Sequence, residues 1–212
     1  MPSVGEIIVT VIAGFGQLVG VRAGTEAPKY EVVEHIGDVE IRHYGPRLAA
    51  EAVVSGPVET ARNEGFRKVA GYIFGGNTTK ASIAMTAPVA QAQAGKSQSI
   101  SMTAPVVQTA DGAGAWRIQF IMPAKYTRAT LPTPTDAAVQ IVDVPAQDYA
   151  VLRYTGSTAA EGVNRKTADL RAAMAGKAWE MTGEPLAWFY DPPWTAPFLR
   201  RNEVAIPVVG RR

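Results

Sequence analysis

The sequence predicts an α+β fold in which an antiparallel sheet is built from two similar halves, each with one helix. Strand patterns stand on both sides of two amphipathic helix patterns, without the regular strand and helix alternation of a parallel sheet. Similar tetrapeptides, RHYG at Arg42–Gly45 and RYTG at Arg153–Gly156, precede the two helices. We expect two pseudo-twofold β-helix-β halves, with a groove where the helices face the sheets.

The first half begins near Tyr30 with strands, which Gly37-Asp38 and Gly45-Pro46 separate. A period of two, typical of a strand with one buried face, runs through Val39, Ile41 and His43 and again through Ala50, Ala52 and Val54. Pro57 then opens a helix that ends at the GGN from Gly75. Its apolar stripe consists of Val58, Ala61, Phe66, Val69, Ala70 and Ile73.

The second half follows the same order. Strands are predicted in WRIQFIMP from Trp116, in AVQIVDVP and in YAVLRYTGS. The helix pattern GVNRKTADLRAAMAGK follows, and we expect its inner face to carry Val163, Leu170, Ala173 and Met174. A strand, a proline-aromatic loop and a closing strand complete the chain. In that loop, the Arg200-Arg201 pair and Glu203 predict an ion pair that fixes the loop.

One phrase occurs twice, as SIAMTAPVA from Ser82 and as SISMTAPVV from Ser99. Each copy reads as a strand that its proline, Pro88 or Pro105, brings to an end, because proline has no amide donor. The two strands would form a hairpin with Met85 and Met102 at comparable positions. Three roles stay open for these methionines: packing in the core, lining the cleft, and ligation of iron.

Length and composition set outer limits on the function. A chain of 212 residues buries a core without disulfides or metals, and it contains no cysteine for a thiolate site or nucleophile. Basic and acidic residues number 21 and 19, with no cationic block that would follow a phosphate backbone. We therefore expect no nucleic-acid partner.

The first 29 residues are expected to stand apart from the domain at 30–212. Residues 4–21, VGEIIVTVIAGFGQLVGV, are almost wholly apolar and are about as long as the shortest helices that span a membrane. A secretory signal would normally have Lys or Arg before its apolar stretch, and none precedes this one. Three interpretations stay open: a membrane anchor or uncleaved signal, a segment lying on a membrane or partner, and a helix packed on the domain. The first two place the protein at a membrane or in the periplasm, and the third leaves it cytoplasmic.

Five phrases resemble the SOUL heme-binding proteins, in family order across Tyr30 to Val208. They are YEVVEHIGDVEIRHYGP, GFRKVAGYIFGGNTTKASIAMTAPV, ISMTAPVV, FIMPAKYT with LPTPTD, and YDPPWTAPFLRRNEV. The resemblance implies a distorted antiparallel barrel of two similar halves flanked by two helices, like the effector-binding domains of multidrug-responsive regulators. It also implies a hydrophobic cleft for non-covalent heme b or another tetrapyrrole, and hence a protein that sequesters, carries or senses heme.

The chain has only two histidines, and His43 matches the position proposed as axial ligand in the histidine-containing branch of the family. The alternative is a strand-end histidine that bonds a neighbour or points to water. His35, beside a glycine turn, is expected to be solvated. In a cleft without an axial bond, Phe66, Val69, Tyr72 and Ile73 would contact the macrocycle, and Arg62, Arg67 and Lys68 would pair with its propionates. The alternative for these cations is the charged outer face of an amphipathic helix.

An enzyme is the weaker interpretation, because no nucleophile elbow, zinc-protease, P-loop or dinucleotide motif occurs. Some relatives in the wider superfamily resemble hydrolases of small electrophiles. Glu180, Glu184, Trp188 and Tyr190 lie near one another in sequence and are the candidates for a hydrolase or isomerase site.

Overall fold

The computed structural model describes residues 26–94, 114–191 and 195–211. Two long helices and ten strands form along these residues, with one short 3-10 helix, η1 (Pro197–Leu199). The helices are α2 (Val58–Ile73) and α3 (Ala160–Met174). The strands are β1 (Glu31–Ile36), β2 (Val39–Tyr44), β3 (Arg47–Ser55), β4 (Val89–Gln93), β5 (Ala115–Ile121), β6 (Val139–Val144), β7 (Gln147–Tyr154), β8 (Trp179–Met181), β9 (Leu186–Phe189) and β10 (Asn202–Gly210).

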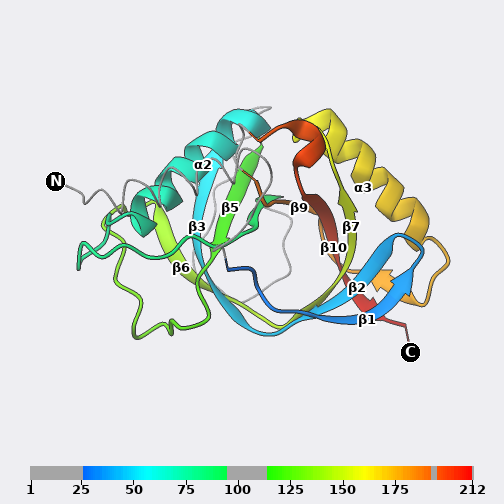
Figure 1. Ribbon diagram of the computed structural model, residues 1–212, viewed down its shortest axis with the longest axis horizontal. Coiled ribbons are helices and arrows are strands. Elements are labelled where there is room, and N and C mark those ends of the chain that lie inside the picture. The colour runs from blue at the N-terminus through cyan, green and yellow to red at the C-terminus, as the bar shows by residue number, and fades with distance from the viewer. Residues whose placement is uncertain (1–25, 95–113, 192–194, 212) are drawn as a thin grey trace.

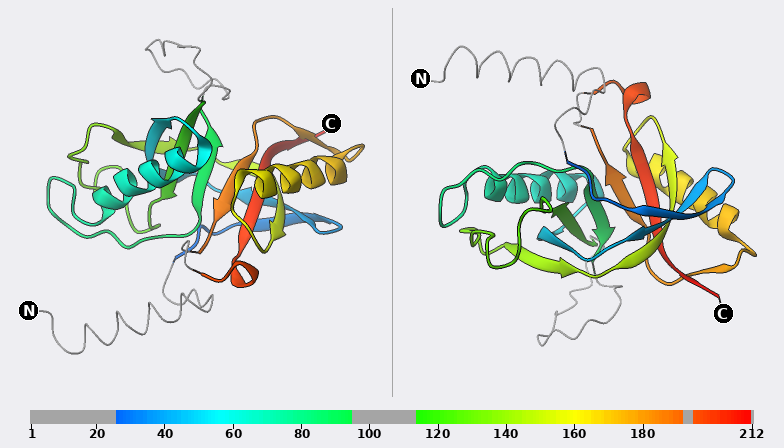
Figure 2. Two further views of the ribbon diagram at one scale, coloured as in Figure 1. Left: turned by 90° about the horizontal axis from the view of Figure 1, so that it is seen from above. Right: turned by 60° about the horizontal axis from the view of Figure 1, so that its bottom comes forward.

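All strand pairs are antiparallel and join into one sheet, in the order β1-β2-β7-β10-β9-β4-β5-β3-β6, with β8 beside β10. The sheet curves strongly, and α2 and α3 flank it on its outer sides (Figure 1). Seen from above, each helix lies over its own half (Figure 2). The α+β class with two helices is confirmed. Within the described residues the sheet stays open between β1 and β6, so it does not form the closed barrel that the resemblance implies.

The two halves repeat with an offset of 100 positions in their outer strands. Ile41 of β2 pairs with Ala150 of β7, and Ala50 of β3 pairs with Ile141 of β6, so the register is the same on both sides. Each half therefore places one strand, β2 or β6, beside a strand of the other half.

This register corrects the tetrapeptide match on which we based the repeat. Arg42–Gly45 ends β2 and leads into β3, whereas Arg153–Gly156 directly precedes a helix. The counterpart of Gly156 is Gly56, and both glycines have a positive φ, 109° and 125°, in the turn between a strand and the following helix. A positive φ of this size is reached almost only by glycine, so both turns depend on that residue type.

Each helix covers a hydrophobic cluster. Beneath α2, Val69, Tyr72 and Ile73 pack on Ile118 and Phe120. The cluster beneath α3 contains Leu170 and Met174, with Val163 and Ala173 packed against it, which confirms the predicted inner face. The opposite face of the sheet carries a third cluster of aromatic and small residues: Tyr44, Ala90, Tyr149, Val151, Trp188 and Ala205.

The first copy of the doubled phrase is not the strand that the sequence predicted. Ser82 and Thr86 make only isolated bridges, and β4 begins at Val89, after Pro88. Proline therefore stands before a strand here, where a missing amide donor removes no ladder bond. The second copy, with Met102, lies outside the described residues.

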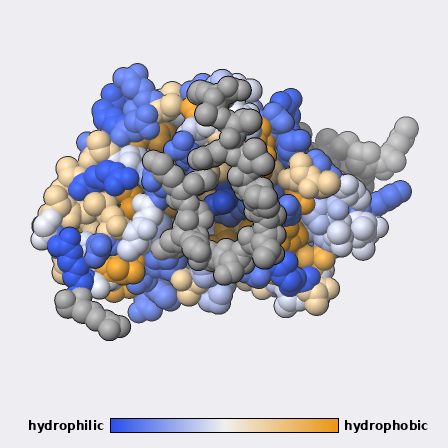
Figure 3. Space-filling model, turned by 180° about the vertical axis from the view of Figure 1, so that it is seen from behind, coloured by the Kyte–Doolittle hydropathy of each residue, from blue (hydrophilic) through white to orange (hydrophobic). Residues whose placement is uncertain are grey.

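The described residues before Tyr30 already contact the domain. Glu26 bridges to Thr86, and its side chain accepts a hydrogen bond from the Ala124 amide. No helix in the described ranges is long and apolar enough to cross a membrane, and residues 4–21 lie outside those ranges. On the face shown in Figure 3, hydrophilic and hydrophobic residues are interspersed over the visible described surface.

Candidate functional site

A groove with a volume of about 270 Å³ lies where the first turns of the two helices approach the middle of the sheet. Its floor is the central strand pair β4 and β9, and its walls come from α2 and α3. This is the groove that the repeat of elements predicted. The lining residues are Val58, Arg62, Gln91, Ala92, Gln93, Trp116, Thr158, Ala160, Val163, Asn164, Thr167, Glu184, Pro185, Leu186 and Ala187.

Arg62 is the cation of this groove. Its guanidinium donates a hydrogen bond to the Thr158 carbonyl oxygen at 2.8 Å and lies 5.1 Å from the ring centre of Phe189. Burial lowers the pKa of Arg62, and the negative charge of Glu59 acts against this effect. No ion pair joins Arg62 to a carboxylate among the described residues. A half-buried guanidinium without an anionic partner is suited to receive a carboxylate of a ligand.

Hydrogen bonds hold the floor and the near wall in place. The buried Gln91 side chain donates to the carbonyl oxygen of Val58, and the Trp116 indole donates to that of Gly56, at 3.0 and 3.1 Å. These bonds tie β4 and β5 to the start of α2. The walls around them are mainly apolar, which suits a flat hydrophobic ligand with few polar groups.

The structure separates the helix residues that the sequence proposed as heme contacts. Val69, Tyr72 and Ile73 are nearly or wholly buried beneath α2, so they belong to the core and line no cavity described here. Arg67 is exposed on α2, and Phe66 is partly exposed while its ring packs on the buried Phe120, with ring centres 5.2 Å apart. Phe66 lies one helical turn beyond Arg62, which places it next to the groove's cation on the helix surface.

Met85 and His43 lie away from the groove. Met85 packs against the cluster beneath α2. His43 is exposed near the end of β2, and its Nδ1 lies 2.6 Å from Oδ1 of Asp148 on β7. This contact corresponds to the alternative in which the histidine bonds a neighbour.

The four candidates for a hydrolase site are also divided among three regions. Glu184 lines the groove, Glu180 lies on β8, and Trp188 and Tyr190 belong to the opposite face of the sheet. Their closeness in sequence therefore does not bring them together.

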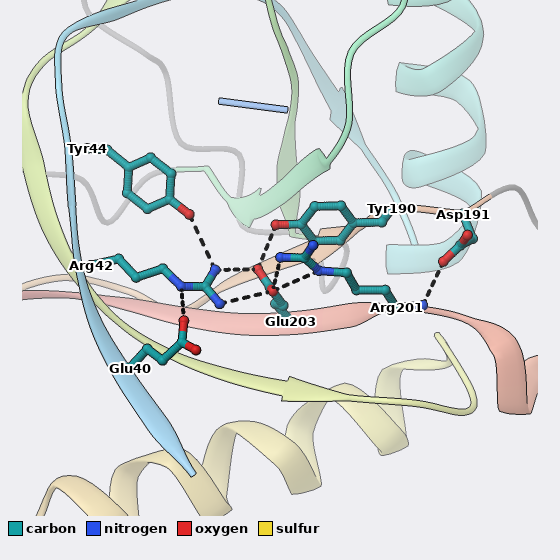
Figure 4. A network of polar contacts seen from close by, with 7 residues as sticks. All are labelled: Glu40, Arg42, Tyr44, Tyr190, Asp191, Arg201 and Glu203. Atoms are coloured by element: carbon teal, nitrogen blue, oxygen red, sulfur yellow. Dashed lines mark hydrogen bonds and ion pairs between the residues drawn. The ribbon is translucent and has the colours of Figure 1, made fainter. Parts of the chain in front are cut away.

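That opposite face holds a buried charge network that the sequence revealed only in part (Figure 4). Glu203 has no exposed surface and bonds Arg42 at 2.9 Å, Arg201 at 2.7 Å and the Tyr190 hydroxyl at 2.7 Å. The predicted ion pair within the Arg-Arg-Asn-Glu stretch is therefore present, formed by Arg201. The other partner, Arg42, lies 161 positions away in the sequence. The only sequence feature that could have predicted this pair is that Arg42 and Glu203 are oppositely charged residues within strands.

The network sets the protonation of its members. Burial alone would raise the pKa of Glu203, but hydrogen bonds and charge from Arg42, Tyr190 and Arg201 hold that pKa below its ordinary range. Burial, together with the charge of Glu203, raises the pKa of Tyr190. Burial also raises the pKa of Tyr44 to about 12, against the opposing influence of Arg42. The carboxylate is thus ionised and both phenols are neutral at physiological pH.

Two solved structures define the class of fold. The C-terminal domain of EcmrR matches 85% of this chain and 98% of that domain with a TM-score of 0.56 at 9% identity. A hydrolase from Listeria innocua matches 88% of this chain and 94% of its own with a TM-score of 0.52 at 11% identity. At these identities the likeness shows the fold alone.

The family follows from the sequence match. The model described as SOUL heme-binding protein matches residues 25–207, and the chain therefore belongs to the SOUL heme-binding protein family. Heme-binding protein 2 of Mus musculus is 41% identical over 69 residues, which are 30% of this chain and 34% of that protein. The match thus spans about a third of that relative.

Proposed function

We propose that this protein binds heme or a related tetrapyrrole reversibly in the groove between α2 and α3. The observation that carries the proposal is Arg62, a half-buried cation without a carboxylate partner in the described chain, at the wall of a mainly apolar groove. The family membership supports the ligand class. Binding would be non-covalent, since the chain has no cysteine to form a thioether.

The size of the groove favours a carrier or buffer over a protein that retains heme permanently. A volume of about 270 Å³ is slightly below the range of about 300–1,000 Å³ that is common for ligand pockets. We therefore expect one edge of the macrocycle to enter between the helices, with a propionate on Arg62 and the apolar edge on Val163 and Leu186. The remaining edge would extend over α2 towards Phe66, where it can leave readily.

Hemin titration with a matched pair of arginine variants tests this placement. Arg62→Gln should weaken hemin binding by about tenfold or more, because a charge-assisted hydrogen bond is lost. Arg67→Gln, on the same helix but outside the groove, should leave affinity unchanged. The Soret absorbance gives the affinity, and equal affinities in the two variants would place the ligand elsewhere.

His43→Ala separates the groove from an axial histidine. We propose that heme in the groove does not depend on His43, so the Soret maximum and the affinity should equal those of the wild type. A shifted Soret band, or a loss of affinity comparable to that of Arg62→Gln, would instead assign His43 as the iron ligand.

Glu184 supports a second candidate, a hydrolase or isomerase acting in the same groove, because it places a carboxylate beside the proposed ligand. A general acid or base must reach the reacting group from such a position. Turnover of an apolar ester or epoxide that Glu184→Gln abolishes, with hemin affinity unchanged, would establish this activity. Equal turnover in both proteins would exclude Glu184 as the catalytic group.

A further inference from the structure

A second, smaller pocket lies on the sheet face opposite the helices, and Arg47 is its charged residue. Strands β2, β3, β4, β5, β6, β7 and β9 all contribute to its wall, so the sheet curves around it. The lining residues are Pro28, Tyr44, Arg47, Pro88, Ala90, Gln119, Ile121, Val144, Tyr149, Leu186 and Trp188. We call this the Arg47 pocket.

Aromatic rings form much of the wall. Tyr44, Tyr149 and Trp188 contact one another edge to face, with ring centres 5.4 to 5.8 Å apart in all three pairs. The guanidinium of Arg47 lies over the Tyr44 ring at 4.5 Å. These contacts fix the walls, and none of them supplies Arg47 with an anion.

Arg47 lacks an anionic partner. Its Nε is buried and has no hydrogen-bond partner, and no carboxylate of the described chain forms an ion pair with it. Burial lowers the pKa of Arg47, with only the phenol groups of Tyr149 and Tyr44 acting against that effect. Arg47 as a whole is half-buried, and a guanidinium that is partly withdrawn from water is stabilised by a hydrogen-bonded anionic partner.

The neighbouring charge network cannot supply that partner. Arg42 and Arg201 are matched by Glu203 and Glu40, through ion pairs of 2.6 to 2.9 Å. Both carboxylates are therefore already engaged. Tyr44 stands between this balanced network and Arg47, with its hydroxyl towards Arg42. Among the described residues, the positive charge of Arg47 stays uncompensated on this face of the sheet.

The free volume limits the ligand. The Arg47 pocket has a volume of about 30 Å³, and a site for one water needs about 10–15 Å³ on the same measure. The space thus admits a group of about three heavy atoms. A planar carboxylate has this size and matches the planar fork of a guanidinium. Pro28, Ile121 and Leu186 offer apolar contact to the carbon that bears it.

We propose that the Arg47 pocket is a binding site for the carboxylate group of a small organic acid, separate from the groove between the helices. The carboxylate pairs with Arg47, and its carbon end meets the apolar wall. The site stands independently of heme binding, because it lies on the other face of the sheet and shares only Leu186 with the lining of the groove.

Sodium acetate is the probe, with sodium chloride at equal ionic strength as the reference. In protein labelled with fluorotryptophan, the resonance of Trp188, assigned with Trp188→Phe, should shift saturably with acetate. The Kd should be on the order of 1 mM, since four heavy atoms give only modest affinity. The resonance of Trp116, in the groove, should stay in place. A Trp188 resonance that responds equally to chloride would overturn the proposal.

Arg47→Met removes the cation and keeps much of the volume. Because it also removes a half-buried charge that has no ion pair in the described chain, we expect it to fold at least as stably as the wild type, which thermal unfolding checks. Acetate should no longer shift Trp188 in this variant, whereas Arg128→Met, at an exposed arginine outside both cavities, should respond like the wild type. Persistent binding in Arg47→Met would refute the assignment.

Sodium hexanoate is the second probe. A site for a small acid should bind acetate and exclude hexanoate. Equal binding of the two acids would overturn the small-acid assignment and indicate a site for the carboxyl end of a longer chain.

Discussion

Glu203 carries a full charge at a position without solvent, and the fold depends on its partners. Both of its oxygens are engaged by Arg42, and Arg201 and Tyr190 complete the set. Such groups stabilise a fold only as a complete set, because the loss of one charge leaves the other charges buried and unpaired.

Glu203→Gln is therefore expected to lower the free energy of unfolding by about 3–5 kcal/mol in urea titrations. Glu40→Gln removes the more exposed partner of Arg42 and should cost less than about 1 kcal/mol. Similar losses in the two variants would show that Glu203 is not the centre of the network.

The same carboxylate predicts acid sensitivity. Since the folded state holds the pKa of Glu203 below its unfolded value, the unfolded state binds the proton more tightly. The stabilisation is complete above the ordinary glutamate pKa of about 4.3 and is lost as pH falls through the lower, folded pKa. Unfolding measured from neutral to acid pH should show this slope in the wild type and a smaller slope in Glu203→Gln.

At the scale of elements, the position of α2 depends on a glycine. A Cβ on Gly65 would lie 2.4 Å from Cγ1 of Ile118, so the helix packs on β5 at a distance that only glycine allows. Gly71, also in α2, faces open space, and a Cβ there would meet no neighbouring residue within 4 Å. These two glycines of one helix therefore differ in what limits them.

We expect Gly65→Ala to destabilise the protein by about 1–3 kcal/mol through overpacking. Gly71→Ala should stabilise it by about 0.5–1 kcal/mol through helix propensity. Urea unfolding of the two variants measures the difference. A neutral Gly65→Ala would mean that the helix can move away from the sheet at little cost.

Both helices and most strands could be predicted from the sequence, because their apolar periodicity follows directly from burial of one face. The conformation of Ser82–Pro88 could not be predicted, because a proline beside a short apolar run can either end a strand or precede one. Arg62 was among the candidates for its charge and helix position. Val69, Tyr72 and Ile73 were misplaced, because helical spacing does not distinguish the face on the core from the face on a groove.

At the scale of the molecule, the two halves are joined by two strand pairs, in which β2 of the first half pairs with β7 and β6 of the second half pairs with β3. Sequence patterns indicated two halves but not these two pairs, because the pairing depends on tertiary register. The RHYG and RYTG match was attractive in sequence but related different strands of the two halves.

The corrected repeat makes a prediction of its own. Gly56→Ala and Gly156→Ala should each cost about 1–3 kcal/mol, because both positions have a φ that alanine adopts only with strain. Neither Cβ would meet another atom, so the penalty is conformational in both halves. Gly45→Ala, where φ is not positive and the space is open, should be nearly neutral in thermal unfolding. Unequal costs at Gly56 and Gly156 would argue against equivalent turns.

The α2 wall of the groove carries Arg62, whereas the α3 wall carries the uncharged Asn164 and Thr167. Two identical halves would present the same side chain from both walls and would accept a ligand equally in either of two orientations. Because both walls belong to one chain, they have diverged, with a charge on one and an amide on the other. The groove is therefore polarised, and an acidic ligand that enters it has a defined front and back.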